Sequence, residues 1–502
     1  MSREKKLRLN TYVALLYQVV TVICGFILPK VIIPYFGSAT NGLISSITQF
    51  LTIITLCECG VGAVVQSALY KPLAEKDEES ISKIMVSANR FFNLIMKILA
   101  IYIGLLMILY PIIIKEEYKF GWIYTSSLIL ILALNYIAQY YLFLPYRLLL
   151  NADQVSYIQL SVHCIQLILN TILTVICVYL GAGVHMVKFV SALVFFIQPI
   201  FLKKYVDRHY NINWKIELIE EPIKQKWNGM AQHIASVILG NTDTVVLTFF
   251  SSLENVSIYG VYYLVVHGVR QIIVSFSTGI QSMFGNMLAK NEIKVLDVSF
   301  SRIELLFHFI VSYMFFMTGI MIIPFIDIYT ENFNDTNYVL PVFAVLMVIA
   351  QASYCIRIPY ETMIRAAGHY KETQLSSIIE ATLNILISVI LVVVLPKSIN
   401  LIGVAIGTII AMTYRTIYLV IYLSKNILYR KLRKFIKLLI IDFVSVAISL
   451  LVTAFVPKLH GNYLQWGWSA LQNALVSMII FFAIYYFLYK KELLKAIKMF
   501  VA

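Results

Sequence analysis

Three ionisable residues lie inside long apolar stretches of the sequence, where a charge needs a partner. Arg270, Glu58 and Asp243 each fall within a run long enough to cross a bilayer, and a charge near the bilayer centre costs about 2.5 to 3.5 kcal/mol even on the most lenient scale. A planar guanidinium can bind an anionic group such as phosphate through two parallel hydrogen bonds. Arg270 is therefore the first candidate for binding an anion, and Glu58 and Asp243 are the candidates for ion coupling.

Polar side chains in the same runs recur every three or four residues, which puts them on one face of a helix. Lipid-facing polar groups are penalised, so these faces are expected to turn toward a bundle or a cavity. For the Ser, Thr and Gly positions, tight helix packing is an equally open interpretation. The further residues expected to line a cavity are Gln49, Gln232, His267 and Gln281.

Other cations lie closer to the ends of their apolar runs. Arg357 and Arg415 are second to Arg270 as candidates for anion binding, because they lie nearer to the membrane surface. Arg147, at the end of a run, is expected to anchor that run at the membrane interface.

The segments that carry these side chains define the fold class. The chain has 502 residues, 60% of them hydrophobic and 13% charged, and its mean hydropathy is +0.82. A helix needs about 20 apolar residues to cross a hydrocarbon core roughly 30 Å thick. The runs that meet this length are 11–33, 43–69, 91–113, 122–145, 155–180, 184–202, 227–250, 257–286, 302–326, 338–360, 373–395, 401–423, 435–457 and 466–489. The sequence therefore predicts an all-α polytopic membrane protein with about 14 transmembrane helices.

Membrane topology explains the formal net charge of +14 without a nucleic-acid partner. With a cytoplasmic amino terminus and fourteen alternating helices, most of the 40 Lys and Arg residues fall on the cytoplasmic side. The cations that fall outside are Lys30, Lys115, Lys119, Lys188, Lys397 and Lys458. This asymmetry follows the positive-inside rule, so we expect a multi-pass protein with both termini cytoplasmic.

No residue pattern in the sequence is typical of an enzyme or a metal site. The eight His residues are scattered, the six Cys residues lie in apolar runs, and no Walker-type phosphate loop occurs. The longest outer connection, near 327–337, is too short for an external catalytic domain. We therefore expect no enzymatic activity, no cofactor and no metal.

Two short stretches indicate an internal repeat. PYRLLLNA at 145–152 and PYETMIRA at 359–366 lie 214 positions apart, and Leu169-Asn170 and Leu383-Asn384 match at the same offset. A duplication gives several matches at one offset, whereas chance does not.

The repeat predicts the domain organisation. Six helices per half make the repeats parallel, so we expect two pseudo-symmetric six-helix lobes with a site near the bilayer midplane between them, plus two extra carboxyl-terminal helices. The expected divisions are an N-lobe at 1–205, a cytoplasmic linker at 206–226, a C-lobe at 227–425, and helices 13 and 14 with a cytoplasmic tail at 426–502.

Several stretches together resemble a known family. The sequence LPKVIIPYFGSATNGL at 28–43, the second run with CECGVGAVVQSALYKPLAEKDEE at 57–79, and the YG at 259–260 in the second half resemble the Wzx-type polysaccharide flippases. These belong to the multidrug/oligosaccharidyl-lipid/polysaccharide (MOP) exporter superfamily. The resemblance covers essentially the whole chain.

The resemblance implies a transporter that flips a polyprenyl-diphosphate-linked oligosaccharide from the inner to the outer leaflet of the bacterial plasma membrane, for surface polysaccharide assembly. It implies alternating access through a central cationic cavity, with a polysaccharide polymerase or other assembly machinery as a partner beside the lipid bilayer. Arg270, then Arg357 and Arg415, would bind the diphosphate. Moving about two negative charges outward gains roughly 2.3 kcal/mol per charge per 100 mV, so membrane potential and counter-ion coupling are both open as driving forces.

The alternative is a cation-coupled multidrug antiporter of the same superfamily. Such a protein should favour buried acids over buried bases, and Asp243 and Glu58 keep this interpretation open. These antiporters commonly stop at twelve helices, so the helix count and Arg270 favour the flippase.

Overall fold

The chain is mostly helical in the part that a computed structural model describes, which excludes residues 1–2, 59–60, 115–119, 141–143, 217–229, 457–460 and 502. Within that part there is no strand, and twelve helices are long and apolar enough to cross a membrane. Two shorter apolar helices, Trp122–Ala138 and Val237–Phe250, account for the other two predicted spans. The predicted all-α polytopic fold class is confirmed.

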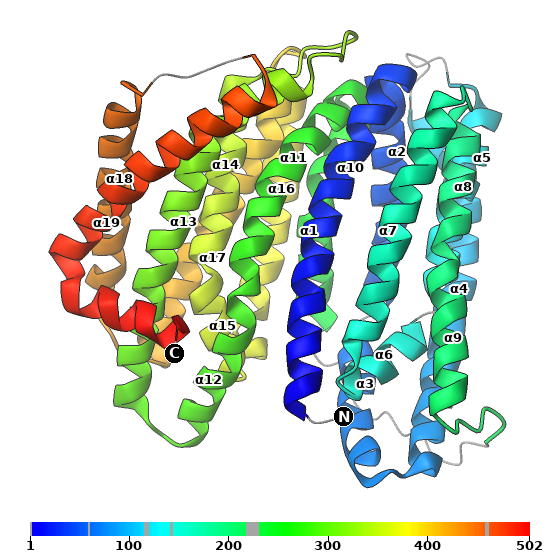
Figure 1. Cartoon of the computed structure of the whole chain (residues 1–502), viewed down its shortest axis with the longest axis horizontal. Coiled ribbons are helices and arrows are strands. Elements are labelled where there is room, and N and C mark those ends of the chain that lie inside the picture. Colours follow the sequence, from blue (N-terminus) through cyan, green and yellow to red (C-terminus); the bar gives the residue numbers. More distant parts are fainter. Residues whose placement is uncertain are drawn as a thin grey trace. The chain divides into compact units, whose positions relative to one another are not determined.

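The first compact unit comprises Met1–Ser257. Its helices are α1 (Arg3–Phe36), α2 (Ser38–Thr52), the 3-10 helix η1 (Ile53–Glu58), α3 (Val61–Glu75), α4 (Glu78–Ile113), α5 (Trp122–Ala138), α6 (Leu144–Ala152), α7 (Ser156–Tyr179), α8 (Val184–Phe195), α9 (Ile197–His209) and α10 (Met230–Phe250). Helix α1 runs beside α7, and α7 packs against α8 (Figure 1). Helix α10 packs against α2 and η1.

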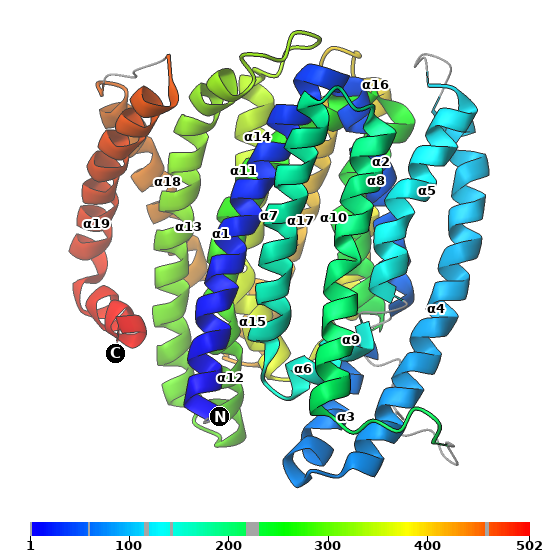
Figure 2. The ribbon, with the colours of Figure 1, turned by 45° about the vertical axis from the view of Figure 1, so that its right-hand side comes forward.

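The second compact unit comprises Ile258–Ala502. Its helices are α11 (Leu253–Ser275, which begins in the first unit), α12 (Ser277–Ala289), α13 (Ile293–Tyr329), α14 (Pro341–Ile356), α15 (Ile358–Ala366), α16 (Tyr370–Val394), α17 (Leu401–Asn426), α18 (Arg433–Thr453) and α19 (Tyr463–Val501). Figure 2 shows the last two helices, α18 and α19, beside α13, and both pack against it.

The helix bounds follow the internal repeat. The described part of α6 and helix α15 are both nine residues long, and they lie 214 positions apart. Pro359 is at the second position of α15, where a missing backbone N–H costs little because the first turn of a helix has no acceptor for it. Pro145 is at the second described position of α6. In the second half the recurring Pro-Tyr thus starts a short helix directly after α14, and the predicted run 338–360 ends there. The lobe bounds taken from the repeat stay a prediction.

Glycines allow the closest helix contact in the second unit. Gly403 and Gly407 on α17 face α16, where a methyl group at Gly407 would lie 2.9 Å from the Ser388 backbone nitrogen and 3.1 Å from its Cα. Small residues spaced four apart are the usual means of close helix approach in membranes, where lipid tails remove the hydrophobic drive for association. The α16–α17 pair therefore depends on these two positions.

The glycine contact gives a prediction for stability. We expect Gly407→Ala to lower the thermal unfolding temperature of the purified protein in detergent, because overpacking costs about 1 to 3 kcal/mol. The matched control is Gly104→Ala in α4, where nothing lies within 4 Å of the added methyl. Alanine there should leave the temperature unchanged or raise it, since Gly in a helix costs about 0.5 to 1 kcal/mol relative to Ala. Equal effects of the two substitutions would contradict the packing argument.

Candidate functional site

Arg270 on α11 lies in a polar setting without a carboxylate partner among the described residues. Its Nη1 donates a hydrogen bond to Oε1 of Gln351 on α14, over 3.3 Å. Its guanidinium carbon lies 3.7 Å from the centroid of the Tyr354 ring, which is a cation–π contact. Its Nε is buried and has no hydrogen-bond partner in the described part of the chain. The side chain thus keeps an unused donor and an unneutralised charge.

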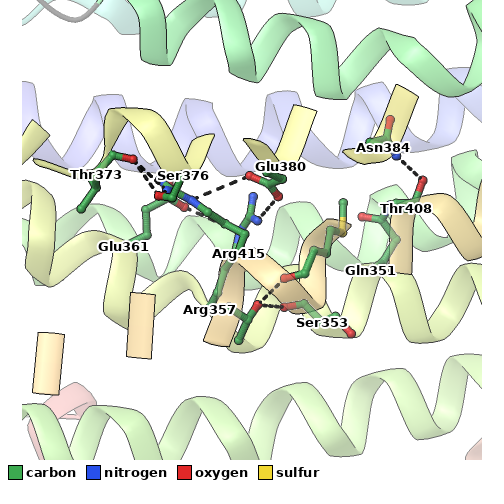
Figure 3. Close-up of polar contacts among 12 residues, drawn as sticks. Gln351, Ser353, Arg357, Glu361, Thr373, Ser376, Glu380, Asn384, Thr408 and Arg415 are labelled. Atoms are coloured by element: carbon green, nitrogen blue, oxygen red, sulfur yellow. Dashed lines mark hydrogen bonds and ion pairs between the residues drawn. The ribbon is translucent and has the colours of Figure 1, made fainter. Parts of the chain in front are cut away.

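Arg357 and Arg415 lie in a different setting, because both pair with Glu380 on α16 (Figure 3). Arg357 donates from Nη1 to Oε1 of Glu380, and Nε of Arg415 lies 3.8 Å from Oε2. Arg357, Arg415 and Glu380 are 4%, 3% and 4% exposed, so the two cations share one deeply buried carboxylate. Such a buried charge cluster stabilises the fold as a unit, because removing one of its charges leaves another without compensation.

Neighbouring groups complete this network. Nε of Arg357 lies 4.0 Å from Oε2 of Glu361, whose Oε1 accepts from the half-exposed Arg365 over 2.6 Å. Arg415 also donates to the Thr373 carbonyl oxygen over 2.9 Å and to the Ser376 hydroxyl. Both predicted anion-binding arginines therefore already have carboxylate partners, in contrast to Arg270.

Tyr354 connects the two settings. Its ring contacts both Arg270 and Arg357, whose guanidinium carbons are 3.7 Å and 4.5 Å from the ring centroid. An aromatic face partly compensates a nearby cation and leaves the N–H groups at the guanidinium edge available. The ring therefore holds Arg270 in place without using its hydrogen-bond donors.

Two more predicted site residues lie near Arg270 along the chain. His267, on the same helix, lies 2.8 Å through Nε2 from the amide nitrogen of Gln271, and its ring stacks on Tyr263 with centroids 4.9 Å apart. Gln281 lies on α12, beyond the break at Phe276 that divides the predicted run 257–286. His267 thus shares a helix with Arg270, and Gln281 does not.

The remaining predicted residues belong to the first unit. The side-chain amide of Gln49 donates to the Asn241 side-chain oxygen and, over 3.3 Å, to the Gly240 carbonyl oxygen, which ties α2 to α10. Asp243 is buried on α10. The side chains of Gln232 and Glu58 lie outside the described residues.

Sequence reasoning missed a polar cavity of about 550 Å³ inside the first unit. No carboxylate is among its lining residues, and Gln159 on α7 is 7% exposed with an Oε1 that has no partner in the described part of the protein. The polar lining residues are Tyr17, Thr48, Asn135, Tyr136, Gln139, Arg147, Asn151, Gln159, His163 and Gln198. The four-residue spacing of Gln159 and His163, and of Asn135 and Gln139, is the signal that could have found it.

A more open cavity of about 1150 Å³ lies where α4 begins and α9 ends. Its lining has charges of both signs, from Glu78, Glu79, Asp207, Arg90 and Lys203. Among the described residues, no group of three or more His, Cys, Asp or Glu side chains could hold a metal ion.

Comparison with known proteins identifies the fold. No model of a known protein family and no curated protein matches the sequence. The structure is similar to that of the lipid II flippase MurJ in an inward closed conformation, with a TM-score of 0.70 and 15% identity over 95% of this chain and 99% of that chain. It is also similar to an inward-facing multidrug resistance MATE family transporter of the MOP superfamily, with a TM-score of 0.56 and 12% identity over 81% of this chain and 95% of that chain.

A Vibrio cholerae MATE transporter gives a TM-score of 0.55 and 16% identity over 84% of this chain and 98% of that chain. At these identities the likeness shows the fold alone, which this chain shares with the flippase and with the two MATE family transporters.

The shared carboxylate gives a second prediction. We expect Glu380→Gln to lower the unfolding temperature strongly, because removing one member of a buried ion pair costs about 3 to 5 kcal/mol. Adding Arg415→Met should recover part of the loss, since one uncompensated charge is then gone. Glu372→Gln, at an exposed position on the same helix, is the control and should change little. An unchanged unfolding temperature for Glu380→Gln would contradict the structural role of the network.

Proposed function

We propose that this protein flips a lipid-linked oligosaccharide diphosphate from the inner to the outer leaflet of a bacterial plasma membrane. The observation that carries the proposal is Arg270, a cation on a membrane-spanning helix that has an amide and an aromatic ring as partners but no described carboxylate. A diphosphate would supply both the missing negative charge and an acceptor for the unused Nε donor. Both termini lie in the cytoplasm in this proposal.

The first-unit cavity supports a role for sugar recognition in the same transport. Its lining of amide, imidazole, hydroxyl and guanidinium groups offers both donors and acceptors, and no carboxylate is among them. Neutral polyhydroxyl groups pair with such side chains, whereas an organic cation would favour acids. The unpartnered Oε1 of Gln159 is an acceptor that a sugar hydroxyl could satisfy.

The structural neighbours favour the flippase over the antiporter. The flippase structure covers 95% of this chain, and the two MATE structures cover 81% and 84%. The difference in the covered share of this chain corresponds to about the combined length of helices α18 and α19. Asp243, buried on α10, is the observation that supports the alternative, a cation-coupled multidrug antiporter.

Membrane potential is a sufficient driving force in this proposal. About two negative charges move outward, which is favourable by roughly 2.3 kcal/mol per charge per 100 mV when the inside is negative. No ATP is required, and the protein would contribute the cation and alternating access. A polysaccharide polymerase or other assembly machinery would receive the flipped substrate.

Arg270 gives the direct test. Purified protein is reconstituted in vesicles, and a lipid-linked oligosaccharide diphosphate is followed until it becomes accessible to an impermeant reagent on the other side. We expect Arg270→Ala to reduce flipping about tenfold or more, since hydrogen bonds to charged groups contribute about 1.5 to 3 kcal/mol. The flipping rate of Arg270→Lys should lie between those of the wild type and Arg270→Ala, because an ammonium keeps the charge but lacks the planar, two-pronged donor geometry of a guanidinium.

Arg365→Ala, at a half-exposed position, is the control for Arg270 and should transport normally. Wild-type protein that flips no lipid-linked glycan but exchanges organic cations for protons or sodium would overturn the flippase and support the antiporter. Folding of each variant is checked by its unfolding temperature.

Gln159 tests the sugar cavity separately. We expect Gln159→Leu to slow the flipping of a lipid diphosphate that carries an oligosaccharide more than that of the same carrier with a single sugar, because only the larger glycan needs the cavity. A paired measurement on both substrates gives the ratio. Equal slowing of both would assign Gln159 to folding rather than to sugar recognition.

A further inference from the structure

A second buried charge cluster joins the last two helices to the rest of the second unit. Glu304 and His308 lie four residues apart on α13, and therefore on the same face, at 1% and 0% exposure. Facing them are Arg430, just before α18, and Asp442, midway along α18. None of these residues belongs to the polar setting of Arg270.

The cluster consists of two contacts with the same plan. Glu304 accepts hydrogen bonds from Arg430 and from the Tyr360 hydroxyl of α15. Asp442 accepts from the Tyr485 hydroxyl of α19 and, over 2.6 Å, lies against Nδ1 of His308. Each contact is thus a carboxylate held by one tyrosine and one nitrogen base.

The two contacts differ in the base. The guanidinium of Arg430 stays protonated at any physiological pH, whereas an imidazole gains or loses its proton in that range. Only the contact between His308 and Asp442 can therefore change its charge near neutral pH. When His308 is neutral with its proton on Nδ1, it donates to Asp442, and Nε2 is a bare acceptor.

The other nitrogen of His308 makes this contact unusual. Nε2 is buried and has no partner in the described part of the chain, and the Phe435 ring packs edge-on against the imidazole with centroids 5.8 Å apart. Protonation would neutralise the charge of Asp442 but leave an N–H at Nε2 without an acceptor. An unsatisfied buried donor costs about 1 to 3 kcal/mol, so the protonated pair favours a rearrangement that provides an acceptor.

We propose that His308 and Asp442 form a proton-binding site through which pH controls the attachment of α18 and α19 to α13. The proton comes from the aqueous phase and forms an N–H bond at Nε2, and no other covalent bond changes. The Nδ1 proton stays paired with Asp442, and the helices adjust around the new donor at Nε2. This site concerns proton binding, so it stands independently of the transported substrate.

Besides His308 and Asp442, the titratable groups in direct contact within the cluster are Glu304, Arg430, Tyr360 and Tyr485. Helices α12 and α14 also pack on α13 but contain no Asp, Glu, Lys, Arg or His. On α15, Glu361 and Arg365 pair with each other. Near the start of α18, Lys434 pairs with Asp297 over 3.3 Å and Lys437 lies over the Tyr489 ring. The other charged residues of α19 with described side chains are Lys490, Lys491, Glu492 and Lys495, near its end. Asp442 is the described acid that contacts the imidazole, and Glu304 lies four residues away on the same face of α13.

A natural reporter lies at the same helix contact. Trp466 on α19 donates from its indole nitrogen to the Met321 carbonyl oxygen of α13, over 3.2 Å. In a full-length variant with Trp122→Phe, Trp214→Phe, Trp227→Phe and Trp468→Phe, Trp466 is the single tryptophan. Its emission between pH 5 and 9 then reports whether α19 stays on α13.

We expect the Trp466 emission of this protein to shift with pH, and the shift to be lost in His308→Gln and in Asp442→Asn. His369→Gln is the control, because His369 contacts the Tyr422 hydroxyl away from the cluster, and it should keep the shift. No shift in the parent protein, or the same shift in His308→Gln, would overturn the proposal.

If His308→Gln or Asp442→Asn does not fold, a second measurement on the protein with both residues intact still tests the proposal. With ¹⁵N-labelled histidine, the His308 imidazole signals should titrate with the same midpoint as the Trp466 emission. Imidazole signals that stay constant over this pH range would overturn the proposal as well. Neither measurement requires a lipid-linked substrate, so its failure is distinguishable from failure of the flippase proposal.

Discussion

A charged side chain on a membrane-spanning helix has no bulk water to solvate it, and this constraint organises the second unit. Glu380 is shared by Arg357 and Arg415, and Glu304 and Asp442 each accept from donors on two different segments. Because each carboxylate needs donors from more than one helix, satisfying its charge also determines which helices pack together. In this unit the contacts that neutralise the carboxylates are therefore also contacts that hold the helices together.

Helix contacts in this unit are of two physical kinds, and they respond differently to conditions. The contact between α16 and α17 combines the pairing of Arg415 with Glu380 and close backbone approach at Gly403 and Gly407, and no change of pH alters the backbone approach. The contact of α13 with α18 and α19 combines aromatic packing with carboxylates and includes His308. An imidazole titrates near neutral pH, so only the second contact contains a group that such a pH change can act on.

The sequence was sufficient for the fold class and for the helix faces, but not for the partners of individual charges. Apolar run length predicts spans because lipid thickness is fixed, and helical period places Arg270 and His267 on one polar face. The partner of Arg357, however, lies 23 residues away on another helix, and period alone does not say which helices meet. Arg147 likewise lines a cavity in the first unit, which its position at the end of an apolar run does not predict.

The same reasoning supports the proposal that the anion binds at Arg270 rather than at Arg357 or Arg415. An anion that binds Arg357 or Arg415 has to compete with Glu380, a carboxylate already in contact and already desolvated. An anion that binds Arg270 displaces no described carboxylate, and the Tyr354 ring holds the guanidinium in place in its absence. Binding there leaves the ion pairs that hold the helices intact. In the proposed transport role this separation is necessary, because the substrate must arrive and leave many times while the fold persists.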